Sequence, residues 1–99
     1  MFVTVAQLDE IPEGRGRTFT VGEQRIAVFR VEGEYYALDD RCPHMGASLG
    51  VGEVRDGAVI CDRHLWAYRL DDGVCPDTPS LKAKTYEVRV EGGDVQVRL

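Results

Sequence analysis

The sequence has little of what nucleic-acid-binding, secreted or membrane-spanning proteins need. Only 12 of its 99 residues are Lys or Arg, against 17 Asp or Glu, so the formal net charge is −5. This sign disfavours binding to nucleic acid or to an anionic membrane surface. No apolar run approaches the roughly 20 residues that cross a bilayer, and no basic stretch followed by an apolar run suggests a signal peptide. We therefore expect a cytoplasmic protein that binds neither nucleic acid nor membranes.

Cysteine and histidine are scarce, with three and two residues respectively. An odd number of cysteines makes a poor disulfide framework. In a reducing compartment, regularly spaced cysteines more often bind metal or take part in chemistry. Both histidines lie within three residues of a cysteine, so we expect none to be left for a Ser-His-Asp catalytic set.

The length and the strand pattern predict one small all-β domain over residues 1–99. Short alternating segments separated by turns recur about every 8–12 residues, which favours an antiparallel sandwich or barrel. We expect strands at residues 1–5, 17–21, 25–31, 35–38, 85–90 and 95–99. Residues 40–84 are instead rich in loops, and they contain all the cysteines and histidines. Long loops in a compact domain are usually functional.

Two short motifs carry the strongest chemical signal. CPH (residues 42–44) is a C-x-H sequence and CDRH (61–64) is a C-x-x-H sequence, with 16 residues between them. Two thiolates and two imidazoles form a mixed sulfur and nitrogen ligand set. One interpretation is a structural zinc site, although zinc sites typically pair Cys with Cys and His with His. The other is a [2Fe–2S] cluster with two Cys on one iron and two His on the other.

The run CPHMGASLG (42–50) followed by CDRHLWAYRL (61–70) resembles the Rieske [2Fe–2S] domain family. Its spacing matches the family over residues 42–70, and the flanking strand pattern extends the resemblance over nearly the whole chain. The resemblance implies that Cys42 and Cys61 hold the inner iron. It implies equally that His44 and His64 hold the outer iron, with one cluster per chain bound by loops within about residues 40–80.

The same resemblance implies roles for neighbouring residues. Gly46 would let the backbone approach the cluster. Trp66 replaces a serine that donates a hydroxyl in high-potential members, whereas Tyr68 stands where those members have a tyrosine. Ala47 and Arg63 occupy the positions of their inter-loop disulfide.

Two imidazoles leave the oxidised cluster with a formal charge of about zero, which raises its potential into the range ≈ −150 to +300 mV. We expect the lower half of that range, with a contribution from a Tyr68 hydroxyl bonded to the Cys42 sulfur.

Other residues of the loop region have less specific interpretations. We expect Cys75 to be a small buried or turn residue in a proline-containing loop, and Leu49 to anchor the first loop to the core. Met45 and Leu65 are candidates for an apolar contact with a partner beside the histidines, although local packing would explain them equally well.

The expected function is one-electron transfer rather than catalysis. The resemblance implies a Rieske-type ferredoxin that carries electrons from a flavin reductase to an oxygenase. A second possibility is the small subunit of an assimilatory nitrite reductase, working with the large subunit. A third, not a redox function, is an interaction module stabilised by zinc.

Overall fold

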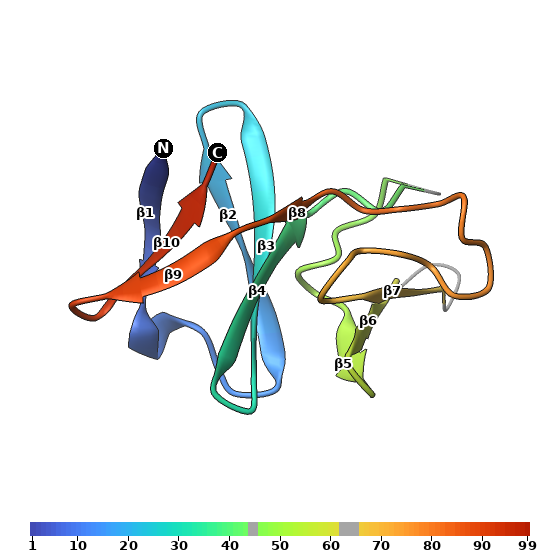
Figure 1. Ribbon diagram of the computed structural model, residues 1–99, viewed down its shortest axis with the longest axis horizontal. Helices are drawn as coiled ribbons and strands as arrows, with labels where there is room; N and C mark the ends of the chain where they lie inside the picture. The colour runs from blue at the N-terminus through green and yellow to red at the C-terminus, as the bar shows by residue number, and fades with distance from the viewer. Residues whose placement is uncertain (44–45, 62–65) are drawn as a thin grey trace.

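The computed structural model describes residues 1–43, 46–61 and 66–99, and within them the strands form three antiparallel sheets (Figure 1). The strands are β1 (Phe2–Gln7), β2 (Arg15–Val21), β3 (Gln24–Val31), β4 (Glu34–Asp39), β5 (Glu53–Arg55), β6 (Ala58–Ile60), β7 (Ala67–Arg69), β8 (Thr85–Tyr86), β9 (Val88–Glu91) and β10 (Asp94–Arg98), with one short 3-10 helix, η1 (Leu8–Glu10). The sheet orders are β1-β10-β9, β2-β3-β4-β8 and β5-β6-β7. The predicted all-β antiparallel fold is confirmed. No helix in the described part of the chain is long and apolar enough to cross a membrane.

Strand β3 is buried on both faces, which explains its continuous apolar run. Successive side chains of a strand point to opposite faces. Ile26 and Val28 enter a core shared with β1 and β10, between the two larger sheets. Ala27 and Phe29 enter a second core shared with the small sheet and the loops around it. One strand therefore holds the sandwich and the loop region together.

The segment 85–90 is predicted as one strand, but the structure divides it between two sheets. Thr85 pairs with Leu38 of β4, whereas Val88 pairs with Val97 of β10. The chain changes sheet at Glu87, whose carbonyl accepts the N–H of Arg98 at 2.9 Å. The alternation of side chains continues through this crossing, so the sequence pattern does not reveal it.

The small sheet β5-β6-β7 lies within residues 40–84, the region expected to be rich in loops, where no strand was predicted. Its strands have three residues each, too short for a clear alternation. The missed signal was the Asp56-Gly57 pair, because both residues have positive φ, 52° and 77°, as a two-residue hairpin turn requires. This sheet lies at the end of the molecule away from the chain termini (Figure 1).

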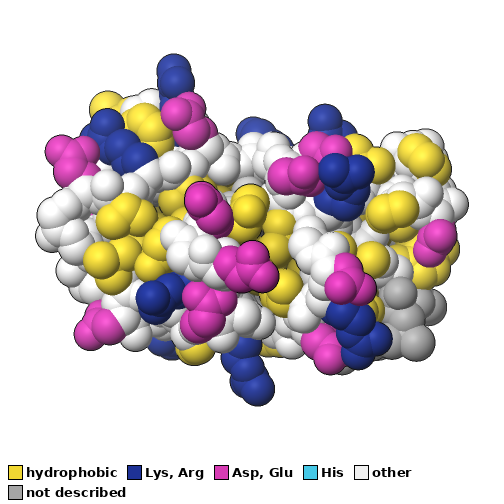
Figure 2. Space-filling model, turned by 60° about the horizontal axis from the view of Figure 1, so that its bottom comes forward, with side chains coloured by type: hydrophobic (Ala, Val, Ile, Leu, Met, Phe, Trp, Pro, Cys, Tyr) yellow, Lys and Arg dark blue, Asp and Glu magenta, His cyan; other side chains and the backbone are white. Residues whose placement is uncertain are grey.

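The surface is mixed in charge. On the face in Figure 2, acidic side chains lie across the middle, whereas most Lys and Arg side chains lie toward the edges. Exposed ion pairs include Arg55 with Glu53 at 2.9 Å and Arg69 with Asp71 at 3.1 Å. Such pairs contribute little to stability, but they limit how much of the charge is available to a partner.

Candidate metal centre

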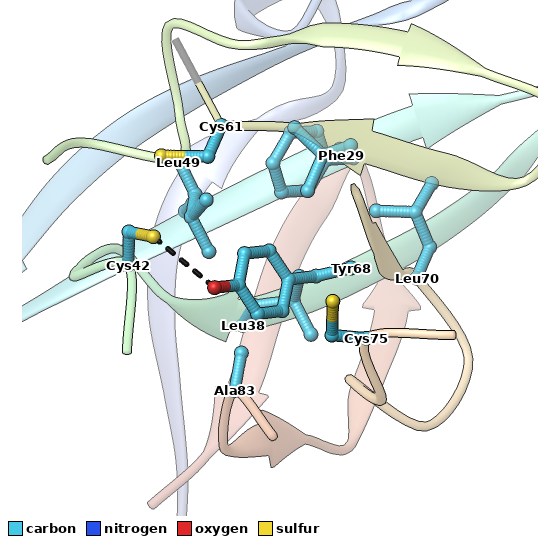
Figure 3. Close-up of a cluster of buried hydrophobic side chains, with 11 residues drawn as sticks. Phe29, Leu38, Cys42, Leu49, Cys61, Tyr68, Leu70, Cys75 and Ala83 are labelled. Carbon is cyan, nitrogen blue, oxygen red and sulfur yellow. Dashed lines mark hydrogen bonds between the residues drawn. The ribbon is translucent and has the colours of Figure 1, made fainter. Parts of the chain in front are cut away.

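Two of the four predicted ligands, Cys42 and Cys61, lie in the same buried cluster of side chains (Figure 3). Cys42 is 1% exposed and Cys61 is not exposed. Cys42 follows β4 and Cys61 follows β6, so the packing of the small sheet against the larger one brings the two loops together. Leu49 is fully buried in the same cluster, which agrees with its expected role as an anchor of the first loop.

The other two predicted ligands, His44 and His64, lie outside the described residues, as do Met45, Arg63 and Leu65. Among residues 1–43, 46–61 and 66–99, no group of three or more Cys, His, Asp or Glu is placed to hold a metal ion. A four-ligand site therefore needs the two histidines, and the assignment of all four ligands remains a prediction.

The first loop closes on itself through backbone hydrogen bonds. The Cys42 N–H donates to the Ala47 carbonyl at 2.8 Å, and the Gly46 N–H donates to the Cys42 carbonyl at 2.8 Å. Gly46 has φ +74°, a left-handed conformation that glycine adopts with little steric cost. An antiparallel bridge between Arg41 and Ser48 closes the base of the loop. Gly46 thus has a conformational role here, and its contact with a cluster remains a prediction.

The second loop connects β6 to β7 and is closed at its base. The Cys61 N–H donates to the Trp66 carbonyl at 2.6 Å, next to the strand pair formed by Ile60 and Ala67. Trp66 is partly buried against the cluster that contains both cysteines. The hairpin therefore fixes Cys61 and Trp66, the described residues on either side of positions 62–65.

Tyr68 lies at the centre of the buried cluster. It is fully buried, and its hydroxyl oxygen lies 3.3 Å from the Cys42 sulfur (dashed line in Figure 3). The pKa of the Tyr68 hydroxyl lies well above its ordinary value, mainly because the group is buried and also because of its hydrogen bond with Cys42. The phenol therefore keeps its proton at neutral pH and has it available to donate to a thiolate.

Cys75 belongs to a third loop that folds back on the same cluster. Its side chain is fully buried, which confirms the expectation of a small buried residue. The Cys75 N–H donates to the Leu81 carbonyl at 3.1 Å, and the Thr78 N–H donates to the Cys75 carbonyl at 3.1 Å. The loop is thus held by its own backbone, and it covers one side of Tyr68 (Figure 3).

Asp40, which is only 2% exposed, is not among the site residues predicted from the sequence. It lies directly after β4, in the run Asp39-Asp40-Arg41-Cys42. Its position beside the first motif was the only signal, and a run of charged residues equally predicts an exposed turn.

Comparison with known proteins agrees with this geometry. Residues 1–91 match the model of the Rieske [2Fe-2S] domain. The chain is 34% identical over 98 residues to the biphenyl dioxygenase ferredoxin subunit of Pseudomonas sp. strain KKS102, covering 97% of this chain and 90% of that protein. It is similar to a chain in the complex of reduced oxygenase and oxidized ferredoxin of carbazole 1,9a-dioxygenase. The TM-score is 0.85 and the identity 30%, and the match covers 97% of this chain and 91% of that chain. It is also similar to a protein assigned as the small subunit of an NADH-dependent nitrite reductase of Mycobacterium tuberculosis. The TM-score is 0.92 and the identity 30%, and the match covers 100% of this chain and 96% of that chain.

Proposed function

Because this chain belongs to the Rieske [2Fe–2S] domain family, we propose that it is a ferredoxin-type electron carrier that takes electrons from a reductase and delivers them to an oxygenase. The observation that carries the proposal is the burial of Cys42 and Cys61 in one cluster, with the Tyr68 hydroxyl beside the Cys42 sulfur. A bound [2Fe–2S] cluster takes up and releases one electron. The chain supplies ligands and surroundings, and the chemistry on a substrate belongs to its partner.

The donor set fits such a cluster. Cys42 and Cys61 offer thiolates, the ligands that hold iron–sulfur clusters, from two loops that are each closed by backbone hydrogen bonds. His44 and His64 would supply the imidazoles from the same two loops. Family membership favours this assignment over a structural zinc site. We place these loops within about residues 40–80 of a single domain that spans residues 1–99.

The partners are proposed from the relatives. One relative is by name a subunit of biphenyl dioxygenase, and one structural neighbour belongs to a complex of an oxygenase with its ferredoxin. We therefore propose a flavin reductase as electron donor and an oxygenase as acceptor. The net charge of −5 favours basic surfaces on both partners. The odd number of cysteines suits a reducing compartment, and we place the carrier in the cytoplasm.

Metal analysis of anaerobically purified protein tests this function. We expect iron and sulfide in equal amounts and no stoichiometric zinc, together with visible absorption and an EPR signal on reduction. The midpoint potential is expected in the lower half of the range ≈ −150 to +300 mV. His44→Ala and His64→Ala are each expected to abolish the chromophore. Zinc in place of iron, or a chromophore that survives either replacement, would contradict the proposal.

The similarity to a nitrite reductase small subunit favours a second function, that of an electron-transfer subunit bound to a large oxidoreductase subunit. Purification from the natural host at native abundance distinguishes the two functions. Stable co-elution with a large subunit supports the second function. Elution as a separate small protein, whose reduced form is reoxidised by an oxygenase, supports the first.

A further inference from the structure

Asp40 is the one buried charged residue in the part of the chain that the structure describes, with 2% of its surface exposed. Its Oδ1 atom accepts three hydrogen bonds, from Thr18 Oγ1 at 2.7 Å, Ser48 Oγ at 2.8 Å and Gly50 N at 2.8 Å. Its Oδ2 atom lies 3.5 Å from Nη2 of Arg25. A buried carboxylate is unfavourable unless its oxygens find such donors, so these contacts explain how Asp40 is tolerated.

The contacts join parts of the chain that are far apart in sequence. Thr18 is on β2 and 22 residues from Asp40, whereas Ser48 lies at the far end of the first cluster loop. The backbone of Asp40 takes part as well. Its N–H donates to the Arg25 carbonyl of β3 at 3.0 Å, and its carbonyl accepts the Leu49 N–H at 2.6 Å. One residue therefore ties both ends of the loop to two strands of the larger sheet.

The packing around this carboxylate leaves no room for variation at Gly50. A Cβ atom added to Gly50 would lie 2.1 Å from Thr18 Oγ1 and 3.0 Å from Asp40 Oδ1. Only glycine therefore allows the Gly50 N–H to approach the carboxylate while Thr18 keeps its own hydrogen bond. This steric limit involves the same oxygen atoms as the hydrogen bonds and shows how closely Gly50, Thr18 and Asp40 are packed.

We propose that Asp40 is a positioning residue for the candidate metal centre, whose carboxylate fixes the first cluster loop, and with it Cys42, against the larger sheet. Asp40 acts through the loop, which begins two residues later at Cys42. The inference rests on the proposed function only where it treats Cys42 as a ligand. The attachment of the loop to the sheet is a property of the chain itself.

A pair of threonine variants on one strand tests this role. Thr18→Val removes one donor to Asp40 while keeping the shape of the side chain and the charge of the protein. Thr20→Val makes the same chemical change two residues along β2, at an exposed position. Because both changes are neutral, a difference between the variants in the spectrum of the centre reports a change of geometry rather than of charge.

Three readouts are compared on the purified proteins, with whatever metal they carry. We expect amide hydrogen exchange in residues 46–50 to be about tenfold faster in Thr18→Val, a factor that corresponds to ~1.4 kcal/mol. We also expect a shifted EPR spectrum after reduction and about tenfold faster loss of the chromophore in the presence of an iron chelator. Thr20→Val is expected to match the parent in all three readouts.

Variants of Asp40 provide a rescue test. Asp40→Asn keeps a carbonyl oxygen that accepts the three hydrogen bonds at Oδ1, whereas Asp40→Ala keeps none. Exchange protection of the loop is expected to survive largely in the Asn variant and to be lost in the Ala variant. If the Ala variant does not fold, the threonine pair decides alone.

Two results would overturn the proposal. One is equal loop exchange in Thr18→Val and Thr20→Val. The other is faster exchange in Thr18→Val that extends equally through β1 and β10, because this indicates a general loss of stability without a specific effect on the loop. If the protein contains no iron, the proposed function fails, but loop exchange still decides whether Asp40 holds the loop.

Discussion

The hydroxyl oxygen of Tyr68 lies 3.3 Å from the sulfur of Cys42, although the two residues are 26 positions apart in the sequence. Tyr68 belongs to β7 of the small sheet and Cys42 to the loop that follows β4. Their contact therefore joins the two halves of the candidate metal centre inside a core from which water is excluded. Since the pKa of Tyr68 is raised, the hydroxyl is the donor whenever Cys42 is a thiolate.

The first prediction concerns this hydrogen bond. Tyr68→Phe is expected to lower the midpoint potential by on the order of 40 mV, because a donor to a ligand sulfur stabilises the reduced cluster and ~1 kcal/mol corresponds to that shift for one electron. Potentiometric titration measures the change. Tyr36→Phe is the control, because Tyr36 packs against the same cluster and its hydroxyl has no hydrogen bond within the described residues. An unchanged potential in Tyr68→Phe would show that the bond has no tuning role.

The second prediction separates the three cysteines. Cys42→Ala and Cys61→Ala are each expected to abolish iron binding, whereas Cys75→Ala is expected to keep the iron content and the visible spectrum of the parent. All three side chains are buried in the same cluster, so they form a matched set. The Cys75 variant should lose only about 1 kcal/mol of stability, from the small cavity left behind. Loss of iron in Cys75→Ala, measured by metal analysis, would make Cys75 a ligand and contradict the assignment.

The third prediction compares two glycines with the same φ of +77°. A Cβ on Gly73 would lie 2.0 Å from the Ala83 carbonyl oxygen, whereas a Cβ on Gly57 would meet nothing within 4 Å. Gly57→Ala should therefore reduce the free energy of unfolding by only about 1–2 kcal/mol, the cost of a left-handed alanine. Gly73→Ala should reduce it by more, because the third loop must move. Urea unfolding followed by circular dichroism measures both, and equal losses would refute the steric argument.

The fourth prediction concerns Tyr86 and alkaline pH. Its hydroxyl donates to Asp39 Oδ1 at 2.5 Å. The pKa of Tyr86 lies above its ordinary value of 10.0, mainly because the hydroxyl is buried and also because it makes this hydrogen bond. The folded state therefore holds this proton more tightly than the unfolded state. The resulting stabilisation is complete below about pH 10 and is lost as the pH rises toward the folded pKa.

The variant Tyr86→Phe tests this expectation. It should be about 1.5–3 kcal/mol less stable than the parent at neutral pH, the value of a hydrogen bond to a charged group. The difference should narrow as the pH rises above about 10, because only the parent loses stability from Tyr86 there. Urea unfolding at a series of pH values measures both proteins. A difference that stays constant through the alkaline range would show that the pKa of Tyr86 is not raised.

The sequence by itself determined the features that depend on neighbouring residues. The spacing within CPH and CDRH predicted two thiolates and two imidazoles as ligands, and the match to the Rieske [2Fe-2S] domain supports this prediction. Alternating side chains predicted most of the longer strands, since a strand places every second side chain on one face. Gly92 and Gly93 lie between the expected strands at 85–90 and 95–99, and both have a positive φ in the turn between β9 and β10, a conformation that glycine tolerates.

The tertiary structure decided what depends on residues that are distant in the sequence. The division of residues 85–90 between two sheets follows from how those sheets pack, which the alternating pattern does not encode. The meeting of Cys42, Cys61 and Tyr68 in one core follows from the packing of the small sheet on the larger one. The burial of Asp40 is possible only because residues 18, 48 and 50 bring donors to one carboxylate oxygen. A charged side chain is exposed by default, and only the full set of distant donors offsets the loss of water.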